Sequence, residues 1–184
     1  AGAEQLYIFM SESHIGSTVK RPITINVDND KIWPTFCFGT STMASANQKT
    51  IYAKPLNFNI KNAQDVTFTE AASRPYDFTG DGAVQIINSS AATVTINSNT
   101  GVLSEIDTSL KWILTNETGI KDALSFTETA GKYEVAKGYA VTVKNVDGKI
   151  VGTATTEADA AECSTIDLTS VGAGSYTFAV EKLP

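Results

Sequence analysis

Short runs in which apolar and polar residues alternate recur along most of the chain. The pattern is clearest near the C-terminus, over residues 140–143, 166–168 and 176–180. A period of two is typical of a β-strand with one buried face. Asp147 and Gly148 stand between two such runs, and a glycine there can supply the positive φ that a tight hairpin turn needs. We therefore expect a β-hairpin in this region.

The N-terminal part carries the same alternation in shorter pieces. It predicts strands over residues 22–27, 32–38, 51–53, 56–60, 66–69, 83–87 and 92–96. Turn-forming Asp, Asn, Gly and Ser residues separate them. The last two look like a strand pair joined through residues 88–90. Residues 104–114 and 120–126 fit either a strand or a helix. We see no clean internal repeat.

These patterns predict an all-β fold with few or no helices. The expected architecture is a mostly antiparallel β-sandwich, immunoglobulin-like or jelly-roll-like. Charged residues make up only 18% of the chain, which disfavours long helices rich in Glu and Lys. Residues 116–119 interrupt the strand pattern. We therefore expect an N-terminal β region, 1–115, and a C-terminal immunoglobulin-like half, 116–184, packed separately or as one body.

Two C-terminal segments carry a resemblance to known modules. Residues 146–152 read Val-Asp-Gly-Lys-Ile-Val-Gly, and residues 173–180 read Ala-Gly-Ser-Tyr-Thr-Phe-Ala-Val. Such a hairpin, followed by a polar strand and then Ala-Gly-Ser-Tyr, resembles the closing strands of bacterial immunoglobulin-like modules. It also resembles the sorting domains of type IX secreted proteins. The resemblance implies an extracellular or surface-assembly setting and carries no catalytic residues.

Charge and hydropathy narrow the classes of partner. The formal net charge of −6 argues against a nucleic-acid partner, because phosphate binding needs a basic surface. No apolar run approaches the ~20 residues of a membrane-spanning helix. The first residues, Ala-Gly-Ala-Glu, fit either a mature end left by leader cleavage or simple removal of an initiator Met. We expect a location outside the cell or on a virion.

The sequence offers little for catalysis. His14 is the single histidine, and nothing near it resembles a nucleophile elbow. Paired carboxylates of the glycosidase kind stay open, because the two partners can be distant in sequence. The acidic residues here nevertheless fall mostly in turns, where they are common for structural reasons. We therefore expect a protein that is not an enzyme.

The best candidate for a metal site is a calcium loop beginning at Asp77. Asp77, Thr79 and Asp81 occupy ligand positions one, three and five of such a loop, and Gly82 occupies position six. Position twelve holds Asn88 in place of the usual bidentate carboxylate. The alternative is an Asp- and Gly-rich turn between two strands. No other cofactor is expected.

The two cysteines, Cys37 and Cys163, lie far apart in the sequence. A disulfide between them would close a loop of more than a hundred residues and stabilise the fold by roughly 4–5 kcal/mol. The alternative is a pair of buried thiols, because free cysteine is among the most buried residue types. Neither cysteine has the spacing of a metal knuckle or of a redox pair.

A wholly apolar run near the N-terminus is a candidate assembly strand. It consists of Leu6, Tyr7, Ile8, Phe9 and Met10. Such a run is either a strand buried on both faces or a strand donated to a neighbouring subunit.

The aromatic residues allow two interpretations, a sugar-stacking platform or an ordinary core. They are Trp33, Phe36, Phe38, Tyr52, Tyr76 and Trp112.

The sequence thus predicts a structural subunit of an extracellular or particle-surface assembly, a pilus-like filament or a virion surface. Its partners are other copies of itself or other subunits of the same assembly. The alternative is a monomeric carbohydrate-binding or adhesive module, stabilised by calcium at Asp77, Thr79 and Asp81 and binding a glycan.

Overall fold

The computed structural model describes residues 5–8, 17–28, 35–38, 50–63, 65–70, 76–90, 93–96, 111–116 and 122–184. All regular secondary structure in these segments is β-strand, which confirms the all-β expectation. The strands are β1 (Gln5–Ile8), β2 (Ser17–Val19), β3 (Ile23–Asp28), β4 (Thr35–Phe38), β5 (Thr50–Tyr52), β6 (Leu56–Lys61), β7 (Asp65–Glu70), β8 (Tyr76–Phe78), β9 (Val84–Asn88), β10 (Thr93–Ile96), β11 (Lys111–Asn116), β12 (Leu124–Phe126), β13 (Lys132–Val135), β14 (Tyr139–Lys144), β15 (Ile150–Thr156), β16 (Thr165–Asp167) and β17 (Gly174–Lys182).

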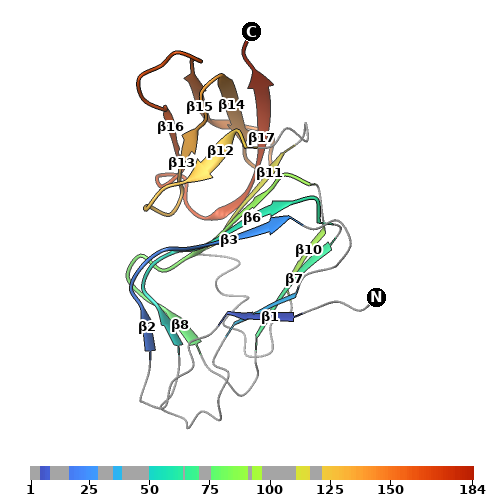
Figure 1. Ribbon diagram of the computed structural model, residues 1–184, viewed down its shortest axis with the longest axis vertical. Helices are drawn as coiled ribbons and strands as arrows, with labels where there is room; N and C mark the ends of the chain where they lie inside the picture. The colour runs from blue at the N-terminus through green and yellow to red at the C-terminus, as the bar shows by residue number, and fades with distance from the viewer. Residues whose placement is uncertain are drawn as a thin grey trace.

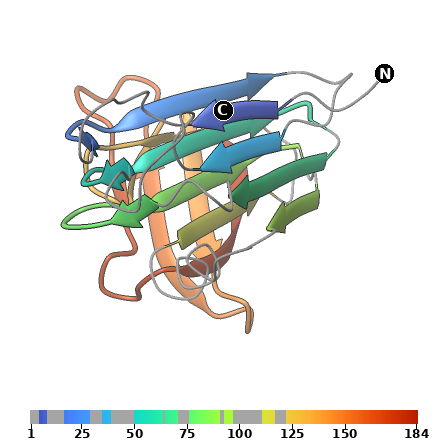
Figure 2. The same cartoon turned by 90° about the horizontal axis from the view of Figure 1, so that it is seen from below.

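Strands β1 to β11 wind into a three-sided parallel stack. Each coil sends one strand to each of three sheets: β2, β3 and β4 in the first coil, then β5, β6 and β7, then β8, β9 and β10. Figure 1 views this stack nearly end-on, with β2 and β8 at lower left, β3 and β6 above, and β1, β7 and β10 on the right. Figure 2 shows the strands of successive coils lying side by side. We call the described residues of 5–116 the parallel stack.

The expectation of mostly antiparallel pairing is wrong for the parallel stack. Every pairing among β1 to β11 is parallel. An alternating sequence pattern indicates only that one face of a strand is buried. Parallel and antiparallel strands show the same pattern, so it does not predict the direction of pairing. The expected pair over residues 83–87 and 92–96 is also wrong, because β9 and β10 lie in different sheets. The chain turns a corner between them and does not fold back.

A repeat underlies the stack although none is evident in the sequence. Val19 pairs with Tyr52 and Ile23 with Leu56, so the first two strands of the first and second coils match at an offset of 33 residues. The third strands of these coils, β4 and β7, match at an offset of 32. Tyr52 then pairs with Phe78 at an offset of 26, and Leu56 with Val84 at an offset of 28. Because coil lengths differ, the sequence shows no fixed period.

The interior of the stack is packed with side chains from its three sheets. Three phenylalanine rings form its centre: Phe36, Phe58 and Phe68, whose centroids lie 4.8–5.4 Å apart. Edge-to-face and offset ring pairs at such distances stabilise beyond their buried area. The remaining buried residues of this core are Val27, Tyr52, Leu56, Ile60, Ala63, Val66, Val84 and Ile86.

Strands β12 to β17 form the C-terminal sandwich, residues 122–184. Among themselves they pair antiparallel, as expected for this half. The hairpin between β14 and β15 turns at Asn145–Lys149, and Gly148 has the predicted positive φ of 78°. A second core lies between the sandwich and the last strands of the stack, to which β9 contributes Ile87 and β11 contributes Leu114. The sandwich supplies the rest of it: Ala123, Leu124, Tyr133, Val135, Val141, Val143, Ile166, Leu168, Tyr176, Phe178 and Val180.

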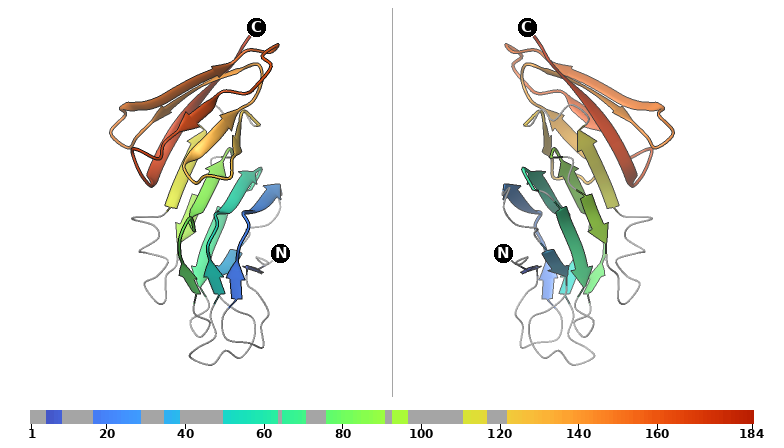
Figure 3. Two further views of the ribbon diagram at one scale, coloured as in Figure 1. Left: turned by 90° about the vertical axis from the view of Figure 1, so that its left-hand side faces the viewer. Right: turned by 90° about the vertical axis from the view of Figure 1, so that its right-hand side faces the viewer.

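One sheet continues through both halves. Residues 174–178 of β17 pair in parallel with β11, and residues 177–182 pair antiparallel with β14. The result is a seven-stranded sheet in the order β15-β14-β17-β11-β9-β6-β3. Figure 3 shows this sheet running from β3 through the stack into the sandwich above it. The sandwich therefore closes one end of the stack, and β3 forms the edge at the other end.

Candidate functional site at the junction of the two halves

The two halves meet on the outer face of the seven-stranded sheet. One row of paired residues crosses this face: Thr24 on β3 is exposed, Asn57 on β6 is buried, and Gln85 on β9 is fully buried. All five residues of β9 are buried, although its outer face would normally meet water. The sandwich therefore covers β9 and leaves β3 uncovered.

Gln85 joins the two halves by hydrogen bonds. Its Oε1 accepts from the backbone N–H of Gly131 at 2.7 Å and from the Tyr133 hydroxyl at 2.9 Å. Its Nε2 donates to Asn57 Oδ1 at 2.8 Å. A buried amide needs such partners, because burying it unpaired costs roughly 1–3 kcal/mol. The three bonds fix the β12–β13 hairpin of the sandwich against the second and third coils.

The polar row continues from this buried amide to the surface. Asn57 Nδ2 donates to Thr24 Oγ1 at 3.4 Å, so hydrogen bonds run from Tyr133 through Gln85 and Asn57 to β3. Burial, and then the nearby Tyr176, raise the pKa of the Tyr133 hydroxyl far above its usual range. This hydroxyl therefore remains a hydrogen-bond donor at physiological pH.

Gly131 permits the close approach of the hairpin to β11. Its φ is +82°, and a Cβ there would lie 3.2 Å from the indole ring of Trp112. The Trp112 Nε1 is buried and has no hydrogen-bond partner in the described part of the chain. The indole thus acts chiefly as an apolar surface on which the hairpin turn rests.

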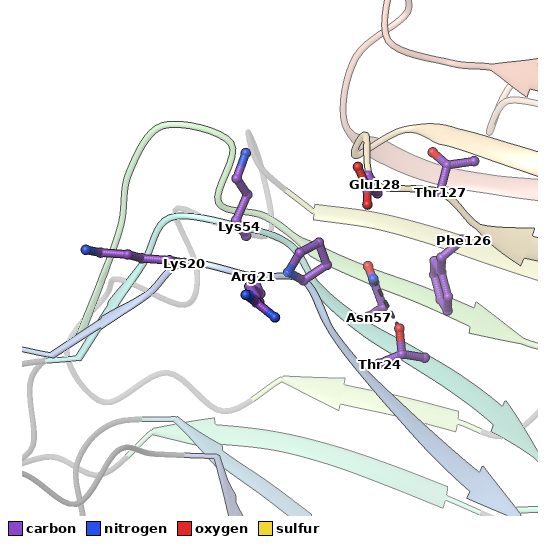
Figure 4. Close-up of a pocket in the computed structure, with 9 residues that line it drawn as sticks. Lys20, Arg21, Thr24, Lys54, Asn57, Phe126, Thr127 and Glu128 are labelled. Carbon is purple, nitrogen blue, oxygen red and sulfur yellow. Dashed lines mark hydrogen bonds between the residues drawn. The ribbon is translucent and has the colours of Figure 1, made fainter.

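A pocket of about 660 Å³ opens beside this junction, between the uncovered part of the sheet and the β12–β13 hairpin. Figure 4 shows Thr24, Asn57 and Phe126 close together at one side of it, with Lys20 at the opposite side. Thr127 and Glu128 enter from the sandwich. The lining residues are Lys20, Arg21, Pro22, Thr24, Lys54, Asn57, Phe126, Thr127 and Glu128.

The basic residues of the pocket come from equivalent corners of two coils. The offset of 33 residues on both sides of this corner places Arg21-Pro22 at the same position as Lys54-Pro55. In the third coil the longer corner brings Asp81 to Lys54, with Nζ and Oδ2 2.6 Å apart. The Lys54 and Asp81 side chains are 38% and 71% exposed, so solvent screens the pair and it contributes little to stability. Neither Lys20 nor Arg21 has an ion-pair partner among the described residues.

The structure places the calcium-loop candidate at this same corner of the third coil. Asp77 lies in β8, and Thr79 and Asp81 are exposed in the turn that follows. The turn itself explains both glycines: Gly80 has φ +57°, and a Cβ on Gly82 would lie 2.1 Å from the Tyr52 carbonyl oxygen. No group of three or more His, Cys, Asp or Glu residues suited to a metal occurs in the described segments. The calcium site stays a prediction.

The other candidate residues are dispersed. Cys37 lies in β4 of the stack, whereas Cys163 lies in the sandwich before β16 and has a free thiol. Leu6, Tyr7 and Ile8 of the candidate assembly strand belong to β1, which pairs in parallel with β4. Phe9, Met10 and His14 lie outside the described residues.

Among the candidate aromatic residues, the described side chains of Phe36, Tyr52 and Trp112 do not form a common surface. Phe36 and Tyr52 are 2% and 1% exposed and belong to the core of the stack. Trp112 is half-buried under the hairpin turn, and Trp33 lies outside the described residues. For Phe36 and Tyr52 the core interpretation of the sequence is therefore the right one.

The sequence interpretation missed the pocket, although a signal for it exists. Residues 21–27 read Arg-Pro-Ile-Thr-Ile-Asn-Val and residues 54–60 read Lys-Pro-Leu-Asn-Phe-Asn-Ile. Both follow the order basic, Pro, apolar, polar, apolar, Asn, apolar. An alignment of these two segments would have predicted that the corners before them lie side by side, with their basic residues adjacent. Phe126 and Glu128 carry no such signal, because the sandwich brings them to the pocket only through tertiary packing.

Comparisons with protein-family models, with curated proteins and with solved structures find no match to this chain. In the described part of the chain there is also no helix of the length and hydropathy needed to span a membrane. Function must therefore be inferred from the junction and from the ends of the sheets.

Proposed function

We propose that the chain is a structural subunit of an extracellular or particle-surface assembly, and that copies join at the open end of the parallel stack. The observation that carries this proposal is the difference between the two ends of the stack. At one end β11 is covered by β17. At the other, β3 pairs with β6 alone among the described strands.

The open end has the features of an incomplete core. Ile23 and Ile25 of β3 pack against the interior of the stack but are only partly buried. The strands β1 and β2 are likewise edge strands of their sheets among the described residues. Repeat proteins bury such terminal surfaces under a cap or a partner, because each repeat is stabilised mainly by its neighbours. A second copy can supply that cover.

The backbone of β3 also offers hydrogen bonds to a partner. The N–H of Ile23 donates to the Pro55 carbonyl at 3.1 Å, so this residue faces β6. Successive residues of a strand direct their peptide groups to opposite edges. The N–H groups of Thr24, Asn26 and Asp28 therefore face away from β6. An edge of this kind can add a strand from another chain.

The opposite edge of the same sheet is less suited to assembly. The pairing of β14 with β15 is interrupted by a register shift between Val143 and Lys144, and such a bulge twists an edge away from a flat partner. The pairing of β3 with β6 has no shift. Thr24 and Asn26, in the middle of the β3 edge, carry no charge that would repel an added strand.

The test compares Asn26→Pro with Asn26→Ala. Both variants remove the exposed side chain of Asn26, but only proline removes the outward N–H, which makes no bond to β6. Native protein and Asn26→Ala should form large particles or filaments by light scattering and negative-stain microscopy. Asn26→Pro should remain monomeric.

Two further variants keep the result interpretable. Asn26→Lys leaves the backbone intact and should weaken assembly by adding charge to the edge. Ile25→Pro removes an N–H that faces β6 and should unfold the chain, which checks the assigned direction of the peptide groups. Native protein that stays monomeric at high concentration would contradict the proposal. So would assembly of Asn26→Pro equal to that of Asn26→Ala.

A further inference from the structure

The junction pocket differs in charge from the rest of the molecule. Its lining residues include three cations, Lys20, Arg21 and Lys54, and one carboxylate, Glu128. The whole chain carries a net charge of −6. A local excess of positive charge on an acidic protein concentrates anions at that place.

Two of these cations are available to a ligand. Lys54 is paired with Asp81, whereas Lys20 and Arg21 have no ion-pair partner among the described residues. A guanidinium binds a carboxylate through two parallel N–H···O bonds, which fixes both position and orientation. The corner at Lys20 and Arg21 can therefore hold one carboxylate.

The opposite side of the pocket is polar and held in place. Asn57 is 1% exposed, and its amide is oriented by Gln85 on one side and by Thr24 on the other. The Thr24 hydroxyl accepts from Asn57 and keeps its own proton for a ligand. Thr127 Oγ1 already donates to the Lys132 carbonyl at 2.7 Å and accepts from the Thr129 N–H at 3.2 Å, so it adds one further acceptor position. Such groups match the hydroxyls of a sugar.

Phe126 supplies the one aromatic surface among the described residues that line the pocket. Its ring is half-buried and is supported by the Tyr133 ring, with centroids 6.2 Å apart. A half-exposed ring beside polar groups can cover one face of a sugar ring, whose C–H groups are apolar. The other lining residues are too polar for a lipid chain.

We propose that this pocket binds an acidic oligosaccharide, with a uronate carboxylate at Lys20 and Arg21 and the sugar ring against Phe126. Thr24 and Thr127 bind the ring hydroxyls, and the buried Asn57 holds Thr24 in position. This site does not depend on the assembly proposed above. The site uses side chains on the outer face of the sheet and at the corner before β3, whereas assembly uses the outward backbone N–H groups of β3.

The experiment uses two ligands that differ only in charge. One is a tetrasaccharide with two glucuronate residues, and the other is the same tetrasaccharide with both carboxyls methyl-esterified. Calorimetric titration of the full chain should show binding of the acid, weakened by added salt, and at least about tenfold weaker binding of the ester. Equal binding of both forms, or binding of neither, overturns the proposal.

Variants locate the site. Arg21→Gln removes one charge and should weaken binding of the acid by about tenfold. Phe126→Leu keeps the apolar volume but removes the flat ring, and it should also weaken binding. Lys149→Gln removes a charge from the distant β14–β15 turn and should leave the affinity unchanged. An affinity that is insensitive to Arg21→Gln and Phe126→Leu overturns the proposed site, as does complete displacement of the sugar by equimolar acetate.

Discussion

The parallel stack and the C-terminal sandwich are built from strands with the same alternating pattern, but they connect those strands differently. In the stack, β3 pairs with β6 and β6 with β9, a full coil away. In the sandwich, β14 pairs with β15 across a short turn. Local hairpins close small loops, whereas each coil must close a loop of about 30 residues before its strands can pair. Each coil of the stack therefore depends on the adjacent coils for its stability more than each hairpin of the sandwich depends on distant segments.

This difference explains why the sandwich lies at the end of the stack. A parallel stack leaves unpaired backbone groups on its last strand. Here β17 pairs with β11, and the β12–β13 hairpin covers the outer face of β9. The C-terminal sandwich, whose strands pair across short turns, thus caps the parallel stack, whose strands pair only with those of other coils.

The largest expected effect comes from a glycine inside the stack. A Cβ on Gly82 would lie 2.1 Å from the Tyr52 carbonyl oxygen of the neighbouring coil and 3.0 Å from the Thr79 carbonyl oxygen of its own turn, and both are backbone atoms. Gly82→Ala must therefore push two coils apart. We expect it to lower the free energy of unfolding by more than about 3 kcal/mol, measured by urea titration.

The matched change in the sandwich is Gly148→Ala. This glycine has φ +78°, and a Cβ there would meet no atom within 4 Å. Its cost is the left-handed backbone alone, about 1 kcal/mol. Equal losses for Gly82→Ala and Gly148→Ala would contradict the view that coil-to-coil approach limits the stack.

The same contrast determines how much of the fold could be predicted from the sequence. Local pairing in the sandwich could be predicted from the sequence, because Asp147-Gly148 marks the turn between β14 and β15. Residues 176–180 of β17 also alternate between buried and half-buried positions, as their sequence pattern predicts. In the stack, the alternation located β3, β6 and β9 but not their partners. Pairing there depends on coil length, and the insertion at Gly80-Asp81 changes that length in the third coil.

The candidate site was less predictable than the fold. Gln85 looks like an outward-facing polar residue of an ordinary strand, and only the tertiary structure shows it buried under Gly131 and Tyr133. The Asp77–Asp81 segment did resemble a ligand loop. Its glycines are nevertheless required by the corner of the coil, so a turn constraint and a metal motif share one sequence pattern.

The junction itself can be broken at Gln85. Gln85→Leu leaves the Tyr133 hydroxyl and the Gly131 N–H without their acceptor and Asn57 Oδ1 without its donor. We expect a loss of about 2–4 kcal/mol from these buried groups. Hydrogen exchange should increase most over residues 124–135, because the hairpin loses its attachment to the stack.

The control for Gln85→Leu is Asn59→Leu. Asn59 is in β6, on the same outer face of the sheet as Gln85, but it is only half-buried. It should change stability by less than about 1 kcal/mol and leave exchange in the hairpin unaltered. If Gln85→Leu accelerated exchange equally in every strand, the two halves would unfold as one unit and the junction would not be a separable contact.

The smallest effect, and the most specific one, is the alkaline dependence of stability. Burial raises the pKa of Tyr133 above its usual value of 10.0. Above pH 10 the unfolded chain therefore releases this proton while the folded chain retains it. The unfolded state then binds fewer protons, so the free energy of unfolding falls as pH rises, by up to about 1.4 kcal/mol per pH unit.

Tyr133→Phe removes this dependence together with the bond to Gln85. At pH 7 the variant should lose about 1 kcal/mol, the net value of one hydrogen bond. Between pH 7 and 9 its stability curve should run parallel to that of the native protein, and above pH 10 it should fall less steeply. Tyr176, whose pKa burial also raises, retains part of the slope in both proteins. Identical slopes above pH 10 would mean that the Tyr133 hydroxyl is reached by water, and that the sandwich does not seal the outer face of β9.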